Sequence, residues 1–197
     1  EIFDESIGYK NIVRAFRAET PGHSFDMSRV ELPMMFNLHH PLNLEVIGAE
    51  AQHDNMQSAA YRVIWGFLRK CPASIVRFCI FDPNEGGGSV RMLSNFVYKM
   101  PDSYKRAVTQ MSRTEELLSC LKELEGQTLD FIRDSPDYDD LLDYNAHNPR
   151  RTEAITLLML YDFPLNADAR CLDLLSSVML NGNRCGIYVV LCRNTAA

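Results

Sequence analysis

The sequence lacks several features that would assign a protein class directly. No apolar run reaches the roughly 20 residues that a membrane-spanning helix needs, and residues 1–20 carry no signal-peptide pattern. Positive charge is also in deficit: the net charge is −6, whereas domains that bind a nucleic-acid backbone are usually basic. The sequence therefore predicts a cytoplasmic protein without a membrane segment in this stretch, and its charge does not support DNA as a partner.

Cysteine and histidine are present but form no pattern typical of a metal site. No two of the six cysteines make a C-x-x-C pair, and no histidine stands at zinc-ligand spacing from two of them. The adjacent His39 and His40 would point to opposite faces of a strand. Cys79 and Cys192 lie inside apolar runs, where a free cysteine behaves as a small buried hydrophobe. We therefore predict reduced cysteines and no metal site.

Apolar runs and helical periodicities alternate along the chain from Leu32 onward. We assign residues 1–31 to an N-terminal extension or edge elements, and residues 32–197 to the core domain. Short apolar runs bounded by turn residues predict strands, and apolar residues three or four apart predict helices. Strands are predicted at 33–38, 44–47, 74–81, 97–100, 154–161 and 186–192, and helices at 56–70, 89–96, 112–131 and 168–180.

The alternation of fully apolar strands with helices predicts an α/β fold. Such strands are typical of a mostly parallel sheet that is covered by helices on both faces. Ligands of these sheets bind beyond the carboxyl ends of the strands. The functional question is therefore what the loops at 48–55, 82–88, 162–164 and 193–195 can do.

The first of these loops stands where a phosphate-binding loop, G-x-x-x-x-G-K-[ST], would follow its strand and open a helix. His53 takes the place of the second glycine, Asp54 that of the lysine and Asn55 that of the hydroxyl residue. Glu50 and Asp54 would repel a triphosphate. The sequence thus predicts a degenerate phosphate-binding loop. Its residues are Gly48, Ala49, Glu50, Ala51, Gln52, His53, Asp54 and Asn55.

Three further segments follow in a fixed order. Phe81-Asp82-Pro83 precedes the glycine run Gly86, Gly87 and Gly88, residues 157–164 read L-L-M-L-Y-D-F-P, and residues 180–191 read L-N-G-N-R-C-G-I-Y-V-V-L. These segments are similar to the D-P/F-K-G-G-G, Walker B and G-R-x-x-G-I-H-L-L-L-A-T-Q segments of FtsK/SpoIIIE-type ATPases. Over residues 32–195 the chain therefore resembles the RecA-like domain of these ATPases, which include the type VII secretion ATPases EccC and EssC.

The resemblance implies a three-layer RecA-like P-loop fold, with ATP and magnesium as the candidate cofactors, although neither is certain. It also implies neighbouring domains or subunits of a ring-forming motor as partners, and a continuation of the domain beyond residue 197. Asn194 falls at the position of the family's polar sensor. DNA is a partner of the family, but the charge of this chain does not support it.

Asp162 stands at the end of the segment that resembles Walker B. One alignment gives Asp162 the place of the catalytic glutamate and Tyr161 that of the magnesium-binding aspartate. A shift by one residue gives Asp162 the magnesium role and Phe163 the glutamate role. Either way one of the two acids is missing. Asp162 is either a functional remnant or a solvated acid at the strand end, and the 86–88 glycines are either a flexible loop or an anion-binding nest.

Three functions remain open at this point. The chain is a degenerate ATPase domain that serves as a regulatory or structural module of a DNA-translocase or secretion-type motor, an active ATPase with a non-standard loop, or a protein-interaction module without nucleotide. Whether it is an enzyme is left open. The resemblance further predicts that the strand ending at Gly48 lies beside the strand ending at Asp162, with the strand ending at Asp82 on the far side. A flavodoxin-type sheet would instead pair 44–47 directly with 78–81.

Overall fold

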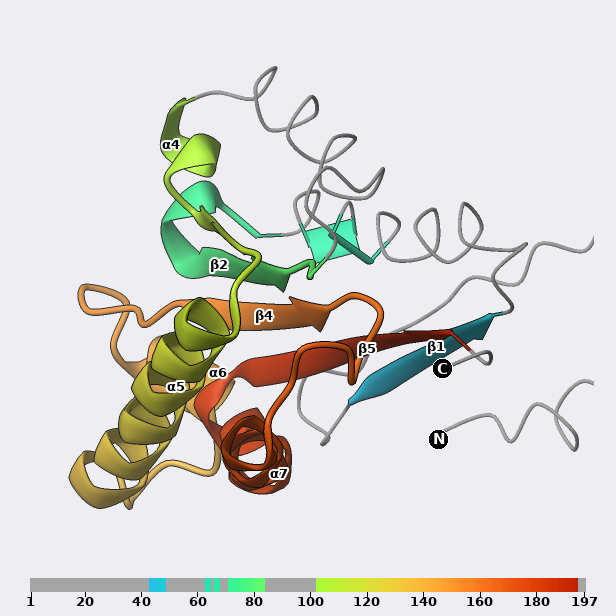
Figure 1. The fold of residues 1–197 in the computed structure, drawn as a ribbon. Coiled ribbons are helices and arrows are strands. Elements are labelled where there is room, and N and C mark those ends of the chain that lie inside the picture. The colour runs from blue at the N-terminus through green and yellow to red at the C-terminus, as the bar shows by residue number, and fades with distance from the viewer. Residues whose placement is uncertain (1–42, 49–62, 65, 68–70, 84–101, 195–197) are drawn as a thin grey trace, which may run out of the picture. The chain divides into compact units, whose positions relative to one another are not determined.

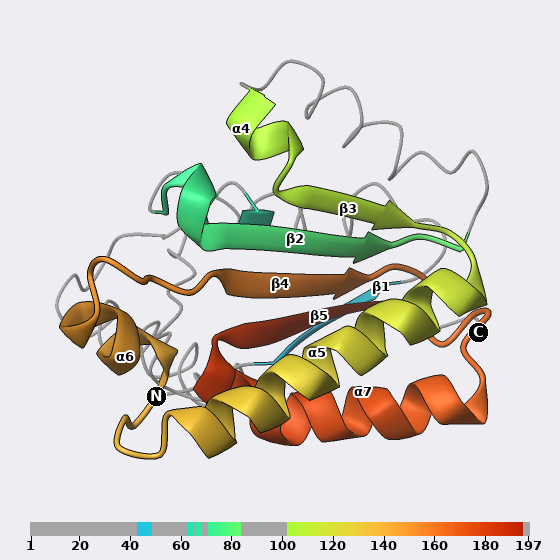
Figure 2. The same ribbon diagram turned by 90° about the vertical axis from the view of Figure 1, so that its left-hand side faces the viewer.

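A computed structural model describes residues 43–48, 63–64, 66–67, 71–83 and 102–194 (Figure 1). These residues contain one parallel sheet of five strands in the order β1-β5-β4-β2-β3 (Figure 2). The proposed extension at 1–31, the strand at 33–38 and the elements expected at 89–100 lie outside the described residues. The strands are β1 (Leu44–Gly48), β2 (Val76–Phe81), β3 (Val108–Met111), β4 (Ile155–Leu160) and β5 (Ile187–Asn194).

Helices connect the strands, and two of them are long. The two long helices were both predicted from their apolar stripes, and each lies within three residues of its predicted bounds. A short helix, α6, lies within the acidic stretch at 134–149, where no helix was predicted. The helices are α4 (Asp102–Lys105), α5 (Thr114–Asp134), α6 (Leu141–His147) and α7 (Ala169–Asn181), with 3-10 turns η3 (Ala73–Ile75) and η4 (Gly182–Cys185).

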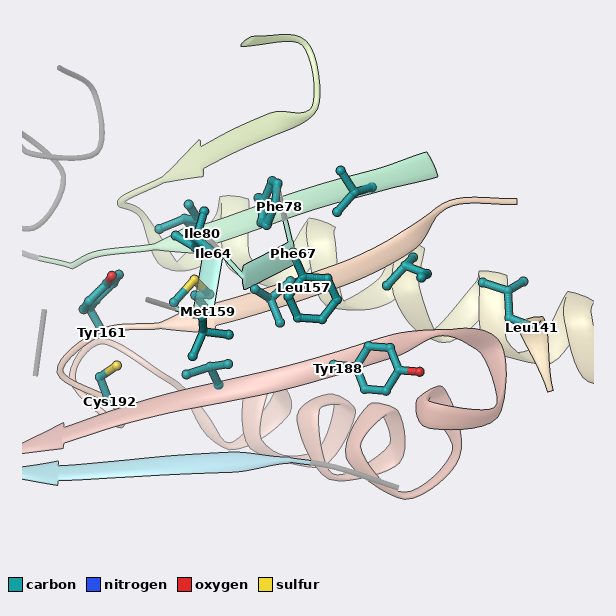
Figure 3. Packing of buried hydrophobic residues seen from close by; sticks show 14 residues of the cluster. Ile64, Phe67, Phe78, Ile80, Leu141, Leu157, Met159, Tyr161, Tyr188 and Cys192 are labelled. Atoms are coloured by element: carbon teal, nitrogen blue, oxygen red, sulfur yellow. The ribbon is translucent and has the colours of Figure 1, made fainter. Parts of the chain in front are cut away.

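Alternating side chains of the central strands build two hydrophobic cores, one on each face of the sheet. One face packs against Val63, Ile64 and Phe67, which are helical and lie in the predicted helix at 56–70 (Figure 3). The other face packs against α5 and α7, which run side by side (Figure 2). All six residues of β4 are buried, as expected for a strand covered on both faces. The described chain is thus a three-layer α/β domain.

The strand order confirms one part of the predicted arrangement and corrects another. β2 does lie on the far side of β4, and β1 pairs with β5 and not with β2, so the flavodoxin-type order is absent. The expected direct contact between β1 and β4 is wrong, because β5 lies between them. Neighbouring strands are about 4.8 Å apart, so one intervening strand separates the two strand ends by only about 10 Å. The ends of β1 and β4 can therefore contact one ligand although the two strands are not adjacent.

The start of α5 shows how a carboxylate fixes a helix end. In the sequence, Ser112-Arg113-Thr114-Glu115 matches a capping box that Glu115 would close. Instead Glu116 accepts hydrogen bonds from the backbone amides of Ser112, at 3.0 Å, and Arg113, at 3.2 Å. The helix begins at Thr114, one residue later than that pattern assumed, so the third helical residue is Glu116.

Within the part of the chain that the structure describes, no helix combines the length and the apolar character that crossing a membrane would require.

Candidate functional site

Because all five strands are parallel, their carboxyl ends gather along one edge of the sheet. In spatial order, this edge carries Gly48 of β1, Asn194 of β5, the turn after Leu160 of β4, Asp82 after β2 and Met111 of β3. The four predicted strand-end loops therefore begin next to one another. This edge is the candidate site.

Gly48 and Asn194 are brought together by the pairing of β1 with β5. The two residues are register partners at the end of the parallel ladder. The backbone of Asn194, the predicted sensor position, therefore lies beside Gly48, the first residue of the segment predicted to be a degenerate phosphate-binding loop. Residues 49–55, the rest of that loop, lie outside the described residues.

The turn after β4 is hydrogen-bonded to the strands on both of its sides. The amide of Tyr161 donates to the carbonyl of Phe81 at 2.9 Å, and the amide of Phe163 donates to the carbonyl of Cys192 at 3.1 Å. Within the turn, the amide of Leu165 donates to the carbonyl of Asp162 at 2.8 Å. These bonds fix Asp162 between the end of β2 and β5.

Asp162 adopts a backbone conformation that few residues other than glycine adopt. Its φ angle is +47°, in the left-handed region, which costs an L-residue roughly 1–2 kcal/mol. Aspartate tolerates this conformation better than most residues. The side chain is half-buried, and its charge lies close enough to Cys192 to affect that thiol. Burial first, and the Asp162 charge second, raise the pKa of Cys192 to about 12. A strained acid at a strand end is a reason to suspect function.

The residues on either side of Asp162 point into the two cores. Tyr161 is 3% exposed and belongs to the core that contains Ile64 and Cys192 (Figure 3). Phe163 belongs to the opposite core, with α5 and α7. In both alignments with Walker B, the position of the missing acid is thus held by an aromatic side chain that packs in a core. Asp162 is the single carboxylate of the turn at 161–166.

Asp82, the first residue after β2, is fully buried at 0% exposed. Its amide donates to the carbonyl of Met111 at 2.9 Å, which ties it to β3. The bond between Tyr161 and Phe81 places Asp82 and Asp162 each one residue beyond a paired position of neighbouring strands. The glycines at 86–88, which the sequence grouped with Asp82, lie outside the described residues.

The contact between the turn and α5 was missed by the sequence analysis. The hydroxyl of Thr114, the first residue of α5, donates to the carbonyl of Asn166 at 2.8 Å. Asn166 also has a positive φ angle, +58°. The sequence did contain a signal for this turn, because Pro164 and Asn166 are typical turn residues. They indicate a tight turn at a place where the family pattern suggested only the end of a strand. The β4 turn is therefore held by β2, by β5 and by α5.

No protein-family model matches the sequence, and no curated protein matches it. Several solved structures do. The pCW3 conjugation coupling protein TcpA, in its monomer form with ATPγS, matches with a TM-score of 0.60 at 12% identity, over 80% of this chain and 44% of that one. EccC (ATPases 2 and 3) from Thermomonospora curvata, in complex with a signal sequence peptide, matches with a TM-score of 0.60 at 12% identity, over 84% of this chain and 27% of that one. EssC (ATPases 2 and 3) from Geobacillus thermodenitrificans matches with a TM-score of 0.59 at 13% identity, over 80% and 29%.

The fold is similar to that of these three solved structures. This likeness, together with the five-stranded parallel sheet and its two helical layers, confirms the predicted three-layer RecA-like class. The chain spans less than half the length of each of these three proteins. The parallel sheet supplies the edge at which Gly48, Asn194 and Asp162 gather, and the residue types at that edge determine what chemistry is available there.

Proposed function

We propose that this chain is a degenerate ATPase domain that acts as a regulatory or structural module of a larger DNA-translocase or secretion-type motor. The observation that carries the proposal is the combination of an ATPase fold with a strand-end edge poor in nucleotide-binding groups. After β1 the sequence offers Glu50 and Asp54 and no lysine, and after β4 it offers Asp162 alone. A phosphate site needs convergent amides and cations.

Magnesium is a second requirement that the edge meets poorly. A catalytic metal in phosphoryl transfer is held by carboxylate and hydroxyl oxygens, while a further acid or amide positions the attacking water. Asp162 would fill one of these roles, as metal ligand or as base. Tyr161 and Phe163 would leave the other role empty, since both pack in cores.

Partners of this module would be neighbouring domains or subunits of the motor. The support is the domain likeness to TcpA, EccC and EssC, whose matched chains are longer than this one. The net charge of −6 favours protein partners over direct contact with a nucleic-acid backbone.

An active ATPase with a non-standard loop is the main alternative, and phosphate release separates the two. The chain, incubated with magnesium and ATP, is expected to release phosphate at the buffer rate. Phosphate release that is lost in Asp162→Asn, but kept in the matched control Asp173→Asn on the exposed side of α7, would show an active enzyme and contradict the proposal.

A further inference from the structure

Cys79 and Cys120 come from different layers of the domain and meet between them. Cys79 lies on β2, on the sheet face that packs against α5, and Cys120 lies on α5. Their thiols are hydrogen-bonded to each other. Two cysteines that are 41 positions apart in sequence are thus held as a thiol pair by the packing of the helix on the sheet.

The pair is open to reagents from solvent. Both cysteines are partly exposed, and both line a groove of about 670 Å³ between α5 and the strands β2 and β3. Arg77, Arg106 and Glu123 also line this groove. By contrast, Cys171, Cys185 and Cys192 are buried. Cys71 is partly exposed and serves below as a comparison.

The charges around the pair make the two thiols unequal. The hydrogen bond from Cys120 holds the pKa of Cys79 below its ordinary value, against burial and the Glu123 charge, and Arg77 acts in the same direction. Arg77 stands two residues before Cys79 on the same strand face. The hydrogen bond to Cys79 and burial raise the pKa of Cys120. Burial likewise raises the pKa of Cys71. Cys79 is therefore the thiol that ionises first, and thiolates are the reactive form.

We propose that Cys79 and Cys120 form a dithiol modification site that reacts with small-molecule disulfides of the glutathione type. The Cys79 thiolate attacks one sulfur of the reagent, which forms a mixed disulfide and releases one thiolate. That thiolate, or solvent, takes the proton of Cys120. The Cys120 sulfur then attacks the Cys79 sulfur of the mixed disulfide, so that an intrachain disulfide forms and a second thiolate leaves. The protein dithiol is oxidised by two electrons, and the reagent is reduced to two thiols.

The product would join β2 to α5 covalently. The two side chains already interact and line the same groove, and bond formation needs the two sulfurs to approach to the roughly 2.05 Å of a disulfide. This site is independent of any nucleotide at the strand-end edge, so it does not rest on the proposed function.

Peptide mapping by mass spectrometry tests the proposal on the full chain. After incubation with oxidised glutathione under native conditions, wild-type protein should yield a linked peptide pair that contains Cys79 and Cys120. Cys120→Ser should accumulate glutathione on Cys79, because the second thiol is missing. Cys79→Ser should take up glutathione on Cys120 more slowly, because burial and Glu123 still raise the pKa of Cys120, whereas Arg77 lowers that of Cys79. Cys71→Ser is the matched control and should form the Cys79–Cys120 link as wild type does.

Two results would overturn the proposal. One is a wild-type protein in which glutathione marks Cys71 while no Cys79–Cys120 link forms. The other is faster labelling of Cys120 in Cys79→Ser than of Cys79 in Cys120→Ser. The first result needs only wild-type protein, so it is decisive even if a serine variant does not fold. Circular dichroism before and after oxidation confirms that the labelled chains are folded.

Discussion

The backbone amide of Tyr161 donates a 2.9 Å hydrogen bond to the carbonyl of Phe81, across the boundary between β4 and β2. This bond extends the parallel ladder by one step beyond the end of β4. It therefore sets the position at which Asp82 and Asp162 leave the sheet. The strand-end edge is fixed by backbone pairing as well as by the loops that follow it.

Replacement of Asp162 by glycine and by alanine should give different stabilities. Both changes remove the same carboxylate, so their difference reports the backbone conformation. Because φ at Asp162 is +47°, the glycine variant should be more stable than the alanine variant by about 1 kcal/mol. Urea unfolding followed by circular dichroism measures both free energies of unfolding.

Asp173, an exposed acid within α7, is the control for the Asp162 pair. At Asp173 the order should reverse. The glycine variant should be about 1 kcal/mol less stable than the alanine variant, because glycine is unfavourable inside a helix. An Asp162→Ala variant at least as stable as Asp162→Gly would show that the left-handed turn is wrong.

Substitution by alanine should lower the free energy of unfolding at Gly186 and raise it at Gly126. Gly186 has a φ angle of +71°, and an added Cβ would overlap the side chain of Leu141. Gly186→Ala should therefore lose about 2–4 kcal/mol of unfolding free energy, through the left-handed backbone and through overpacking. In Gly126, inside α5, an added Cβ meets no heavy atom within 4 Å.

Gly126→Ala should therefore gain about 0.5–1 kcal/mol, since alanine favours the helix interior. Thermal and urea unfolding of the two single variants give the signs directly. Equal effects of the two substitutions would contradict the packing of α6 against the turn before β5.

Acid should weaken the start of α5 through Glu116. Hydrogen bonds from the amide of Ser112, from the guanidinium of Arg113 and from the amide of Arg113 lower the pKa of Glu116 from 4.5 to about 2. A carboxyl whose pKa is lower in the folded than in the unfolded chain stabilises the fold above the unfolded pKa. That contribution should be lost as the pH falls from 4.5 to about 2.

Glu116→Gln should therefore make the unfolding free energy depend less steeply on pH in that window, as measured by urea unfolding at several pH values. Glu115→Gln changes the same formal charge one residue away and is the control. If the unfolding free energy of Glu116→Gln depended on pH as steeply as that of the wild type, the carboxylate would not hold the helix end.

Restoration of the phosphate-binding loop should separate binding from turnover. The triple variant His53→Gly, Asp54→Lys and Asn55→Thr supplies the missing cation and frees the backbone. It should bind magnesium-ATP at least about tenfold more tightly than wild type, a change of about 1.4 kcal/mol. Turnover should stay low, because the turn at 161–163 still holds one acid. Asp54→Lys alone, the charge control, should gain less, and fast hydrolysis by the monomeric triple variant would refute this account.

Much of the fold could be predicted from the sequence because its signals are local. The apolar run at 155–160 and the stripe that includes Leu117 and Leu121 indicate β4 and α5 without knowledge of their partners. β3 was missed, because Thr109 and Gln110 are polar and exposed. The order of the strands was partly wrong because it depends on long-range pairing.

The candidate site was predictable only in outline. Parallel strands must gather their carboxyl ends, so Asp82, Asp162 and Asn194 could be assigned to one edge from the sequence. The left-handed backbone of Asp162 and the core packing of Tyr161 could not, since both depend on contacts made by the β4 turn with β2 and β5. Glu50 and Asp54 were interpreted from their charge alone. The roles of residues 48–55 and of Asn194 stay predictions.

Titration calorimetry of the wild-type chain with magnesium-ATP tests the central claim most directly. The account predicts no saturable heat below millimolar nucleotide, because Glu50 and Asp54 oppose a triphosphate and no lysine attracts it. The triple variant, titrated in the same buffer, shows that the assay detects binding when the loop is complete. Saturable binding of magnesium-ATP by the wild-type chain at micromolar concentration would contradict the claim that this ATPase fold has lost its nucleotide chemistry.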